Sequence, residues 1–309
     1  SLFTNLNTAD ILSLIQLTSV LASVNYYASA VAGTVMERKG DTSNQKLAVA
    51  GAISMLFNDS VTRVLLGDHA NITTTGAAKL NASSETNTRL LGGALSSSGA
   101  KAGIGLNVAT VKQNDKVDAL VGNNAVINAG SFHVSTQYGT DMLVITAAAV
   151  NASGTSVGGG LNVVINNTGA KAQVGTARQI TTTGIENLKG DVDILADSQS
   201  NVILGSVNIS ISGGESKGAA VGGVVTVSTN ASAAEARLMG GTVVSSDGIN
   251  IHANNQELVI NVLAAASRSG NGAAGAGTLG TAGAAAGAGA GSGAGAGAGA
   301  GAGILAAGR

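Results

Sequence analysis

Histidine and aspartate side chains are the groups of this chain best suited to binding a metal or moving a proton. The three histidines are His69, His133 and His252, and each stands in a different part of the sequence. Metal ligands usually lie at close, defined spacing, so we expect each histidine to occupy a solvated turn or strand position. Asp191 and Asp193 would share one face of a strand and could bind a hard cation there, although a solvated strand face is the simpler interpretation.

One glycine motif matches a nucleotide-binding loop. Residues 275–280 read GAGTLG and fit GxGxxG, but the dinucleotide fingerprint also needs an acidic residue about 20 positions later. No Asp or Glu follows Glu257, so we interpret the match as chance. Glu215 and Lys217 stand in a glycine-rich turn and are expected to be surface charges. Because no acid–base set is clustered, we expect no catalytic residue, no metal ligand, no cofactor and no enzyme activity.

The composition differs from that of an ordinary enzyme. Charged residues make up 11% and aromatic residues 2% of the 309 positions, and the chain has no Pro, Cys or Trp. Small and β-branched side chains must therefore be buried instead of large ones, which suits thin, repetitive layers. The net charge of −1, without a basic patch, argues against a nucleic-acid partner. The start at Ser1, without Met or a signal peptide, leads us to expect a fragment or a mature piece.

Four copies of one long pattern follow one another along the chain. Each copy begins with glycines, alternating apolar residues and an asparagine, as in GGGLNVVINN at 158–167. A second phrase follows with Gly67, Gly122, Gly175 or Gly240, and these glycines are 55, 53 and 65 residues apart. The long third interval needs an insertion, which we place at 180–189. A fixed long period predicts a solenoid or an array of repeats.

Alternation of apolar residues within each copy predicts short β-strands. Counted back from the asparagine, the residues in register are Ile53 and Met55, Leu161 and Val163, and Val225 and Val227. The copy that ends at Asn114 is out of register, which a turn insertion near 112–113 would explain. We expect about five short strands per copy in an all-β fold, a parallel β-helix with roughly two to three coils per copy and right-handed winding.

The repeated asparagine explains why the phrase recurs. At one turn position, Asn58, Asn114, Asn166 and Asn230 would stack and hydrogen-bond along the axis, while glycines allow a tight corner and small apolar residues fill a narrow interior. Seven N-x-S/T sequons occur, at Asn58, Asn71, Asn81, Asn151, Asn166, Asn208 and Asn230. They could be glycosylated in a suitable host, but a chain this rich in Asn, Ser and Thr produces them by chance.

The two ends differ from the repeats, so we divide the chain into 1–46, 47–270 and 271–309. Residues 11–36 carry no charge and place apolar residues at helical spacing. Their length permits a membrane span, but their polar residues favour a helix or strands that cap the solenoid. The Gly/Ala tail is a silk-like assembly segment, a flexible linker or a stretch of unidentified sequence.

The repeat unit resembles those of very large bacterial surface proteins. The resemblance covers about 47–270 and is carried by GIGLNVATV, ALVGNNAVINAG, GGGLNVVINN, AQVGTARQITTTG and DILADS. These segments resemble filamentous-haemagglutinin-like and autotransporter-type passengers, and in repeat style the fusobacterial leukotoxin and related large adhesins. The resemblance implies a β-solenoid, export with an outer-membrane secretion partner, and an extracellular location on the bacterial cell surface. The secretion signal and transporter-recognition domain of such families are missing from this sequence.

We expect a non-catalytic structural or adhesive segment of a secreted surface fibre. Its partners would be a host cell-surface protein or glycan, or neighbouring copies of itself. A self-assembling extracellular filament subunit and the passenger of a leukotoxin-like cytotoxin are the alternatives. An enzyme on the same fold is also conceivable, because fold alone does not decide function.

Overall fold

Long β-strands make up the part of the protein that the computed structural model describes, which is residues 25–36, 47–98, 101–184, 190–213 and 219–268. The strands are β1 (Tyr26–Met36), β2 (Leu47–Leu66), β3 (Asn71–Thr73), β4 (Ala77–Ser98), β5 (Ala102–Val121), β6 (Val126–Ala129), β7 (Ser131–Ala152), β8 (Thr155–Thr182), β9 (Val192–Ser212), β10 (Ala220–Ser245) and β11 (Ile249–Arg268). Strands of globular proteins usually have about three to ten residues, whereas β8 has 28.

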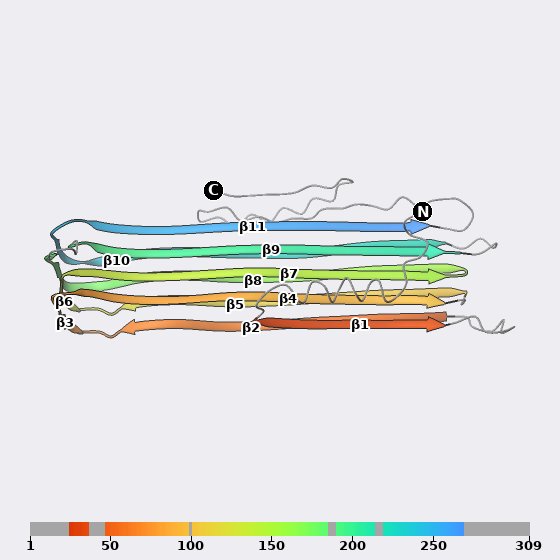
Figure 1. Ribbon diagram of the computed structural model, residues 1–309, viewed down its shortest axis with the longest axis horizontal. Coiled ribbons are helices and arrows are strands. Elements are labelled where there is room, and N and C mark those ends of the chain that lie inside the picture. The colour runs from red at the N-terminus through yellow and green to blue at the C-terminus, as the bar shows by residue number, and fades with distance from the viewer. Residues whose placement is uncertain (1–24, 37–46, 99–100, 185–189, 214–218, 269–309) are drawn as a thin grey trace.

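The strands form two sheets in which every pairing is parallel. The first sheet has the order β1-β4-β7-β9-β11, and the second has the order β2-β5-β8-β6-β3, with β10 paired to β8. Consecutive long strands alternate between the sheets, and the arrowheads of the first sheet all point to the same end in Figure 1. The all-β prediction with parallel strands is therefore confirmed, and the arrangement is consistent with a β-solenoid.

Each copy of the repeat forms one coil, so the prediction of two to three coils with about five short strands per copy was wrong. Partners in the second sheet are about one repeat apart in sequence, as for Asn114 and Asn167, which are 53 residues apart, and Asn166 and Asn230, which are 64 apart. The prediction failed because Gly, Asn, Ser and Thr within the phrase were interpreted as turn residues. In the structure they lie inside continuous strands.

Two connections account for the long third interval. Residues 183–191 join β8 to β9, whereas in the preceding coil Gly130 alone separates β6 from β7. Residues 213–219 join β9 to β10, whereas in the preceding coil 153–154 make the equivalent connection from β7 to β8. The insertion predicted at 180–189 overlaps the first of these connections, but Ile180 still belongs to β8, and 185–189 lie outside the described residues.

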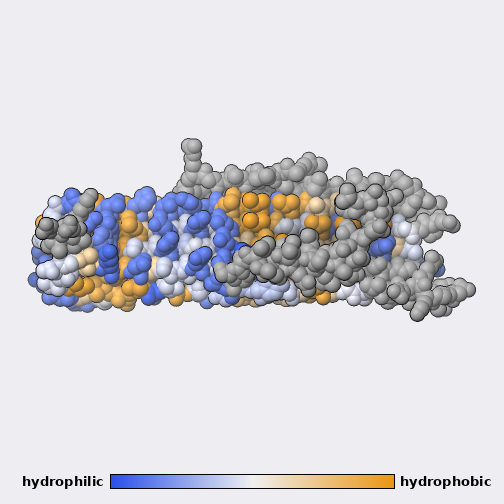
Figure 2. Space-filling view, viewed as in Figure 1, coloured by the Kyte–Doolittle hydropathy of each residue, from blue (hydrophilic) through white to orange (hydrophobic). Residues whose placement is uncertain are grey.

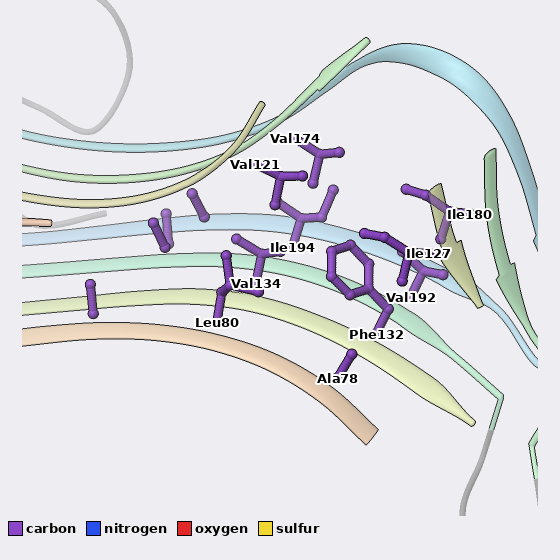
Figure 3. Close-up of a cluster of buried hydrophobic side chains, with 14 of the residues drawn as sticks. Ala78, Leu80, Val121, Ile127, Phe132, Val134, Val174, Ile180, Val192 and Ile194 are labelled. Atoms are coloured by element: carbon purple, nitrogen blue, oxygen red, sulfur yellow. The ribbon is translucent and has the colours of Figure 1, made fainter. Parts of the chain in front are cut away.

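The main apolar core lies between the sheets, near the end where the second sheet returns to the first (Figure 3). Phe132 and Val134 point inward from β7 and meet Ile194 of β9, while Val121 and Val174 face them from the second sheet. All five side chains are buried. Alternation along each strand sends every second side chain inward, and the parallel register places equivalent residues of successive coils beside one another.

The apolar residues of the glycine phrase are in register as predicted, but they point out of the solenoid. Ile53 pairs with Val108, Val108 with Leu161, and Leu161 with Val225. Ile53 is 61% exposed and Val225 57%. The inward positions beside them hold small or polar residues, among them Ala52, Asn107, Asn162 and Thr226. The narrow interior predicted here is therefore filled by the alternate set of residues.

The asparagine ladder forms in the middle of the strands and not at a turn, which corrects the predicted position. Its inward row consists of Asn58, Gln113, Asn166 and Asn230, and Asn166 Nδ2 donates to Asn230 Oδ1 at 2.5 Å. Gln113 occupies the row because β5 pairs without interruption, so no turn insertion exists near 112–113. An outward row adjoins it, in which Asn114 donates to Asp59 at 3.0 Å and accepts from Asn167 at 3.1 Å.

Residues 26–36 form a strand, so the helical spacing read across 11–36 was misleading for this part. Strand β1 pairs with β4 from Tyr26 to Met36 and extends the first sheet. The alternative of strands packed on the solenoid holds here. Residues 1–24 and 269–309, which include the Gly/Ala tail at 271–309, lie outside the described residues, so the cap and the interpretations of the tail stay predictions.

Candidate functional site

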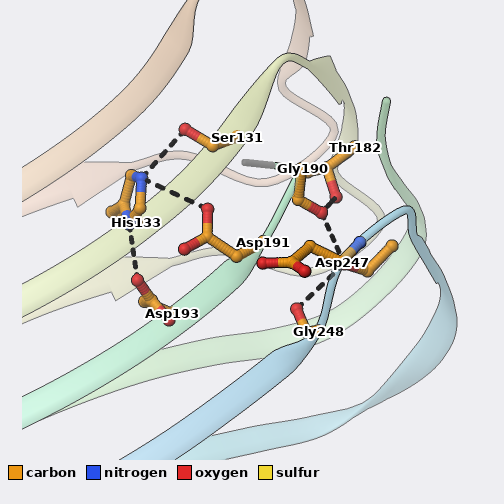
Figure 4. A network of polar contacts seen from close by, with 9 residues as sticks. Ser131, His133, Thr182, Gly190, Asp191, Asp193, Asp247 and Gly248 are labelled. Carbon is orange, nitrogen blue, oxygen red and sulfur yellow. Dashed lines mark hydrogen bonds and ion pairs between the residues drawn. The ribbon is translucent and has the colours of Figure 1, made fainter. Parts of the chain in front are cut away.

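A histidine between two aspartates is the cluster of this protein with the clearest capacity for chemistry (Figure 4). His133 Nδ1 lies 2.9 Å from Asp193 Oδ2, and His133 Nε2 lies 3.8 Å from Asp191 Oδ1. Ser131 Oγ is 2.9 Å from the same Nε2. All three charged or ionisable side chains are partly exposed, at 19% to 26%. The cluster is therefore open to solvent on one side.

Strand register brings these residues together. The segments GSFH at 130–133 and GDVD at 190–193 occupy the same position in neighbouring coils, and His133 pairs directly with Asp193. Phe132 and Val192 turn inward into the core, so His133, Asp191 and Asp193 beside them face outward, whereas Ser131 is buried. The same row continues to Lys79 of β4 and Asn250 of β11.

The geometry fits a divalent cation held by His133 and Asp191. With Nδ1 protonated, His133 donates to Asp193, and this carboxylate fixes the ring so that Nε2 faces Asp191. The ligand atoms of the three residues lie within 4.8 Å of one another. The contacts from Ser131 to His133 and from His133 to Asp193 also match the order of a catalytic triad, with a serine, a general base and an orienting carboxylate. Ser131 is 0% exposed, so its hydroxyl is out of reach of a substrate in this arrangement.

The sequence predicted two of the three residues of this cluster. Asp191 and Asp193 do share an outer strand face as expected, but His133 was assigned to an isolated position. Alignment of GSFH at 130–133 with GDVD at 190–193 would have placed His133 beside Asp193, once each repeat is known to form one coil. His69 instead adopts a φ of 60° in the turn after β2, and His252 is exposed on β11. Glu215, Lys217 and the GxGxxG match lie outside the described residues.

A second polar cluster is buried inside the solenoid around Asp115, which is 0% exposed. Tyr138 Oη donates to Asp115 Oδ2 at 2.9 Å, and Gln113 Nε2 donates to the same oxygen at 2.9 Å. Asn58 and Ser60 donate to the other carboxylate oxygen, each at 2.8 Å. Burial, followed by the charge of Asp115 and the hydrogen bond to it, raises the pKa of Tyr138 above its ordinary value. The cluster is closed to ligands and serves to fix the coils.

A polar groove of about 580 Å³ crosses the outer face of the first sheet. It spans four strands, and its lining includes Glu85 of β4, Gln137 and Asp141 of β7, Gln199 and Asn201 of β9, and Gln256 of β11. Asn201 Nδ2 donates to Asp141 Oδ1 at 2.8 Å across two coils. Amide and carboxylate groups in this density suit a ligand with many hydroxyls. Sequence reasoning missed the groove because its residues come from different copies.

The sequons do not behave as one group. Asn166, Asn208 and Asn230 are buried inside the solenoid, whereas Asn71, Asn81 and Asn151 are exposed. Only the exposed positions could carry a glycan on the folded chain.

The comparisons with known proteins give no relative: no family model, no curated protein and no solved structure matches this chain. Among the described residues there is also no helix of sufficient length and apolar character to cross a membrane.

Proposed function

We propose that this chain is a non-catalytic structural segment of an extracellular fibre on a bacterial surface, built by stacking of right-handed β-solenoid coils. One observation carries the proposal: the described coils are in register, and the outermost strands pair on one side only. These are β1, β2 and β3 at one end of the stack, and β10 and β11 at the other. A strand with an unpaired edge is a template for another strand.

The inward asparagine row supports continuation of the stack across copies. Asn58 lies in the first coil of the second sheet and Asn230 in the last. If β10 of one copy lies beside β2 of the next, the row continues with an asparagine on each side of the junction. Stacked amide side chains stabilise such parallel arrays. Right-handed winding follows the general preference of parallel crossovers. The surface location and an outer-membrane secretion partner are supported only by the family resemblance of the repeats.

A proline on the free edge of β2 tests this proposal. Leu66 O accepts from Gly122, so even-numbered residues of β2 direct their backbone groups to β5, and odd-numbered residues direct theirs to the free edge. Val61→Pro therefore removes an edge donor and leaves the pairing with β5 intact. We expect electron micrographs of the wild type at high concentration to show elongated stacks, and Val61→Pro to remain single.

Val61→Thr is the matched control, because it keeps the N–H and the β-branched shape. Stacks of equal length in the wild type, Val61→Thr and Val61→Pro would contradict edge pairing through β2. Single particles of the wild type at every concentration would contradict stacking altogether.

The polar groove favours a second function, adhesion to a glycan. Its lining presents amide and carboxylate groups from four adjacent strands, and such groups hydrogen-bond sugar hydroxyls. We expect the full chain to bind a subset of a glycan array, and Gln199→Ala to weaken that binding at least about tenfold, since one to two hydrogen bonds are lost. Gln179→Ala, on an exposed part of β8 outside the groove, is the control. Equal loss in both variants would contradict a site in the groove.

A further inference from the structure

Nearly all charges of the described strands lie in one half of the strand length. In the half where the first sheet passes into the second, the described strands hold no Asp, Glu, Lys or His, and one Arg, Arg268 at the end of β11. The uncharged stretches are 26–36, 47–58, 90–98, 102–111, 142–152, 155–170, 198–212, 220–234 and 258–267. We call this part the uncharged half. It includes both sheets, because the end of each strand of the first sheet lies opposite the start of a strand of the second.

Exposed apolar side chains lie on both outer faces of the uncharged half, although the outward Leu91 and Leu95 of β4 are buried. On the second sheet Ile53 is 61% exposed and Val225 57%; on the first sheet Val207 is 45% exposed and Val262 56%. Figure 2 shows hydrophobic residues gathered on the face in view, next to a hydrophilic band. Soluble proteins rarely expose apolar patches larger than a few hundred square ångströms unless the patch binds something.

The interior of the same half holds many polar residues beside a buried apolar cluster that includes Leu90, Val144 and Leu204. Its buried polar residues are Ser54, Ser96, Asn107, Thr146, Ser156, Asn162, Ser206, Asn208, Ser210, Ser212, Thr226 and Asn261. Several bond to one another, as Asn162 Nδ2 does to Ser206 Oγ at 2.5 Å and Thr146 Oγ1 to the same oxygen at 2.7 Å. Aliphatic groups on the outer faces are what an apolar solvent favours, although Ser156 Oγ and Thr226 Oγ1 in the interior have no hydrogen-bond partner.

The length of the uncharged half matches a lipid bilayer. About ten residues at roughly 3.3 Å each span about 33 Å, and the hydrocarbon core of a bilayer is about 30 Å thick. Charged residues border it in sequence on both sides: Arg89 and Lys112 on one, Lys101 on the other. Two of the few aromatic residues lie on the first border, where Tyr27 pairs with Arg89 and Phe57 with Lys112. Aromatic residues are enriched at this depth of membrane proteins.

A second copy of the chain fits these faces less well than lipid. The four strands of the second sheet cover about 33 Å by about 19 Å, or about 600 Å², and the five strands of the first sheet about 33 Å by about 24 Å, or about 800 Å². A stable interface buries roughly 800 Å² per partner, so only the first sheet reaches that size. A second copy would also cover one face and leave the other in water. Acyl chains cover both faces at once.

We propose that the uncharged half enters the hydrocarbon region of a lipid bilayer, with the charged half in water. The proposal rests on the proposed stacking, because unpaired backbone groups on the free edges are costly in lipid. A stack has two open ends whatever its length, each with one free edge per sheet, while each added coil contributes apolar surface. Insertion is therefore cooperative in the number of coils, and stacked copies enter where single copies do not.

Flotation of the full chain with neutral phosphatidylcholine vesicles tests this proposal. We expect the wild type to float with the vesicles at concentrations where stacks form. Ile53→Glu with Val225→Glu, one on each end strand, should lower the floating fraction at least tenfold. Val61→Glu with Val244→Glu is the matched control, because these residues are equally exposed on the same strands but lie in the charged half, at 56% and 54%. The control pair should float like the wild type.

The outcomes separate this proposal from the proposed function. Stacks that form but do not float overturn lipid insertion and leave stacking intact. Chains that neither stack nor float overturn it as well. A third outcome is that the wild type forms oligomers but does not float, and that Ile53→Glu with Val225→Glu dissociates these oligomers. The apolar faces would then bind a second copy, and lipid insertion would be overturned. Flotation of Val61→Pro as single chains would support insertion and overturn stacking instead.

Discussion

Removal of one hydroxyl from the solenoid interior is expected to destabilise the central coils. Tyr138→Phe deletes the donor to Asp115 Oδ2 at 2.9 Å and the acceptor of Gln113 Nε2 at 2.8 Å. Gln113 keeps Asp115 and Thr140 as acceptors, each at 2.9 Å, so no donor is orphaned. The loss is then one hydrogen bond to a carboxylate, and we expect the free energy of unfolding to fall by about 2 kcal/mol.

The pH dependence gives the same variant a second readout. The pKa of Tyr138 is raised in the folded state, so folding favours the protonated phenol. Its stabilising contribution is complete below the ordinary tyrosine pKa of about 10, and it is lost as pH rises above that value. Urea unfolding between pH 8 and 12 should show a steeper loss of stability in the wild type than in Tyr138→Phe.

The control for both readouts is Tyr27→Phe, on the outer face of β1 at 49% exposure. We expect it to change the free energy of unfolding by less than about 0.5 kcal/mol, as surface substitutions usually do. Equal effects of Tyr138→Phe and Tyr27→Phe, or parallel pH profiles of Tyr138→Phe and the wild type, would refute the assigned role of the buried network.

Three further predictions concern packing and surface charge. Gly105→Ala should lower the free energy of unfolding by about 1–3 kcal/mol, because a Cβ there would lie 2.6 Å from Val150 Cγ2. A Cβ at Gly223 would have no atom within 4 Å, so Gly223→Ala should leave the stability unchanged or raise it. Thermal unfolding measures both variants. Arg63→Ala should cost less than about 1 kcal/mol in urea unfolding, despite its 2.7 Å contact with Asp118, because the Arg63 side chain is 53% exposed. Asn166→Ala should cost about 1–3 kcal/mol, because it leaves the buried row without its central amide.

The sequence predicted the order of the repeat but not the size of the coil. The spacing of Gly67, Gly122 and Gly175 and the register of Ile53 with Leu161 and Val225 follow from side-chain alternation, and both agree with the structure. The length of the coil was underestimated because Asn, Ser and Thr are usually found in turns that end strands. Here their side chains face inward and hydrogen-bond to other strands.

The candidate site depended on that same coil size. Asp191 and Asp193 were recognisable as a pair, since alternation acts within one strand. The position of His133 beside Asp193 depends on a pairing 60 residues apart, and a coil of about 20 residues would have separated them. The outward orientation of Ile53 and Val225 was also hidden, because alternation alone does not reveal which of the two faces is inside.

The length of a single strand tests the central claim, that each repeat forms one long coil. The chain has no Cys, so spin labels can be placed at Val49→Cys and Leu65→Cys, on two exposed residues of β2. Sixteen residues of extended strand correspond to about 53 Å between the labelled backbone positions. Double electron–electron resonance should therefore give a distance near about 53 Å, and a distance below about 25 Å, as short strands wound in smaller coils would produce, would contradict the account.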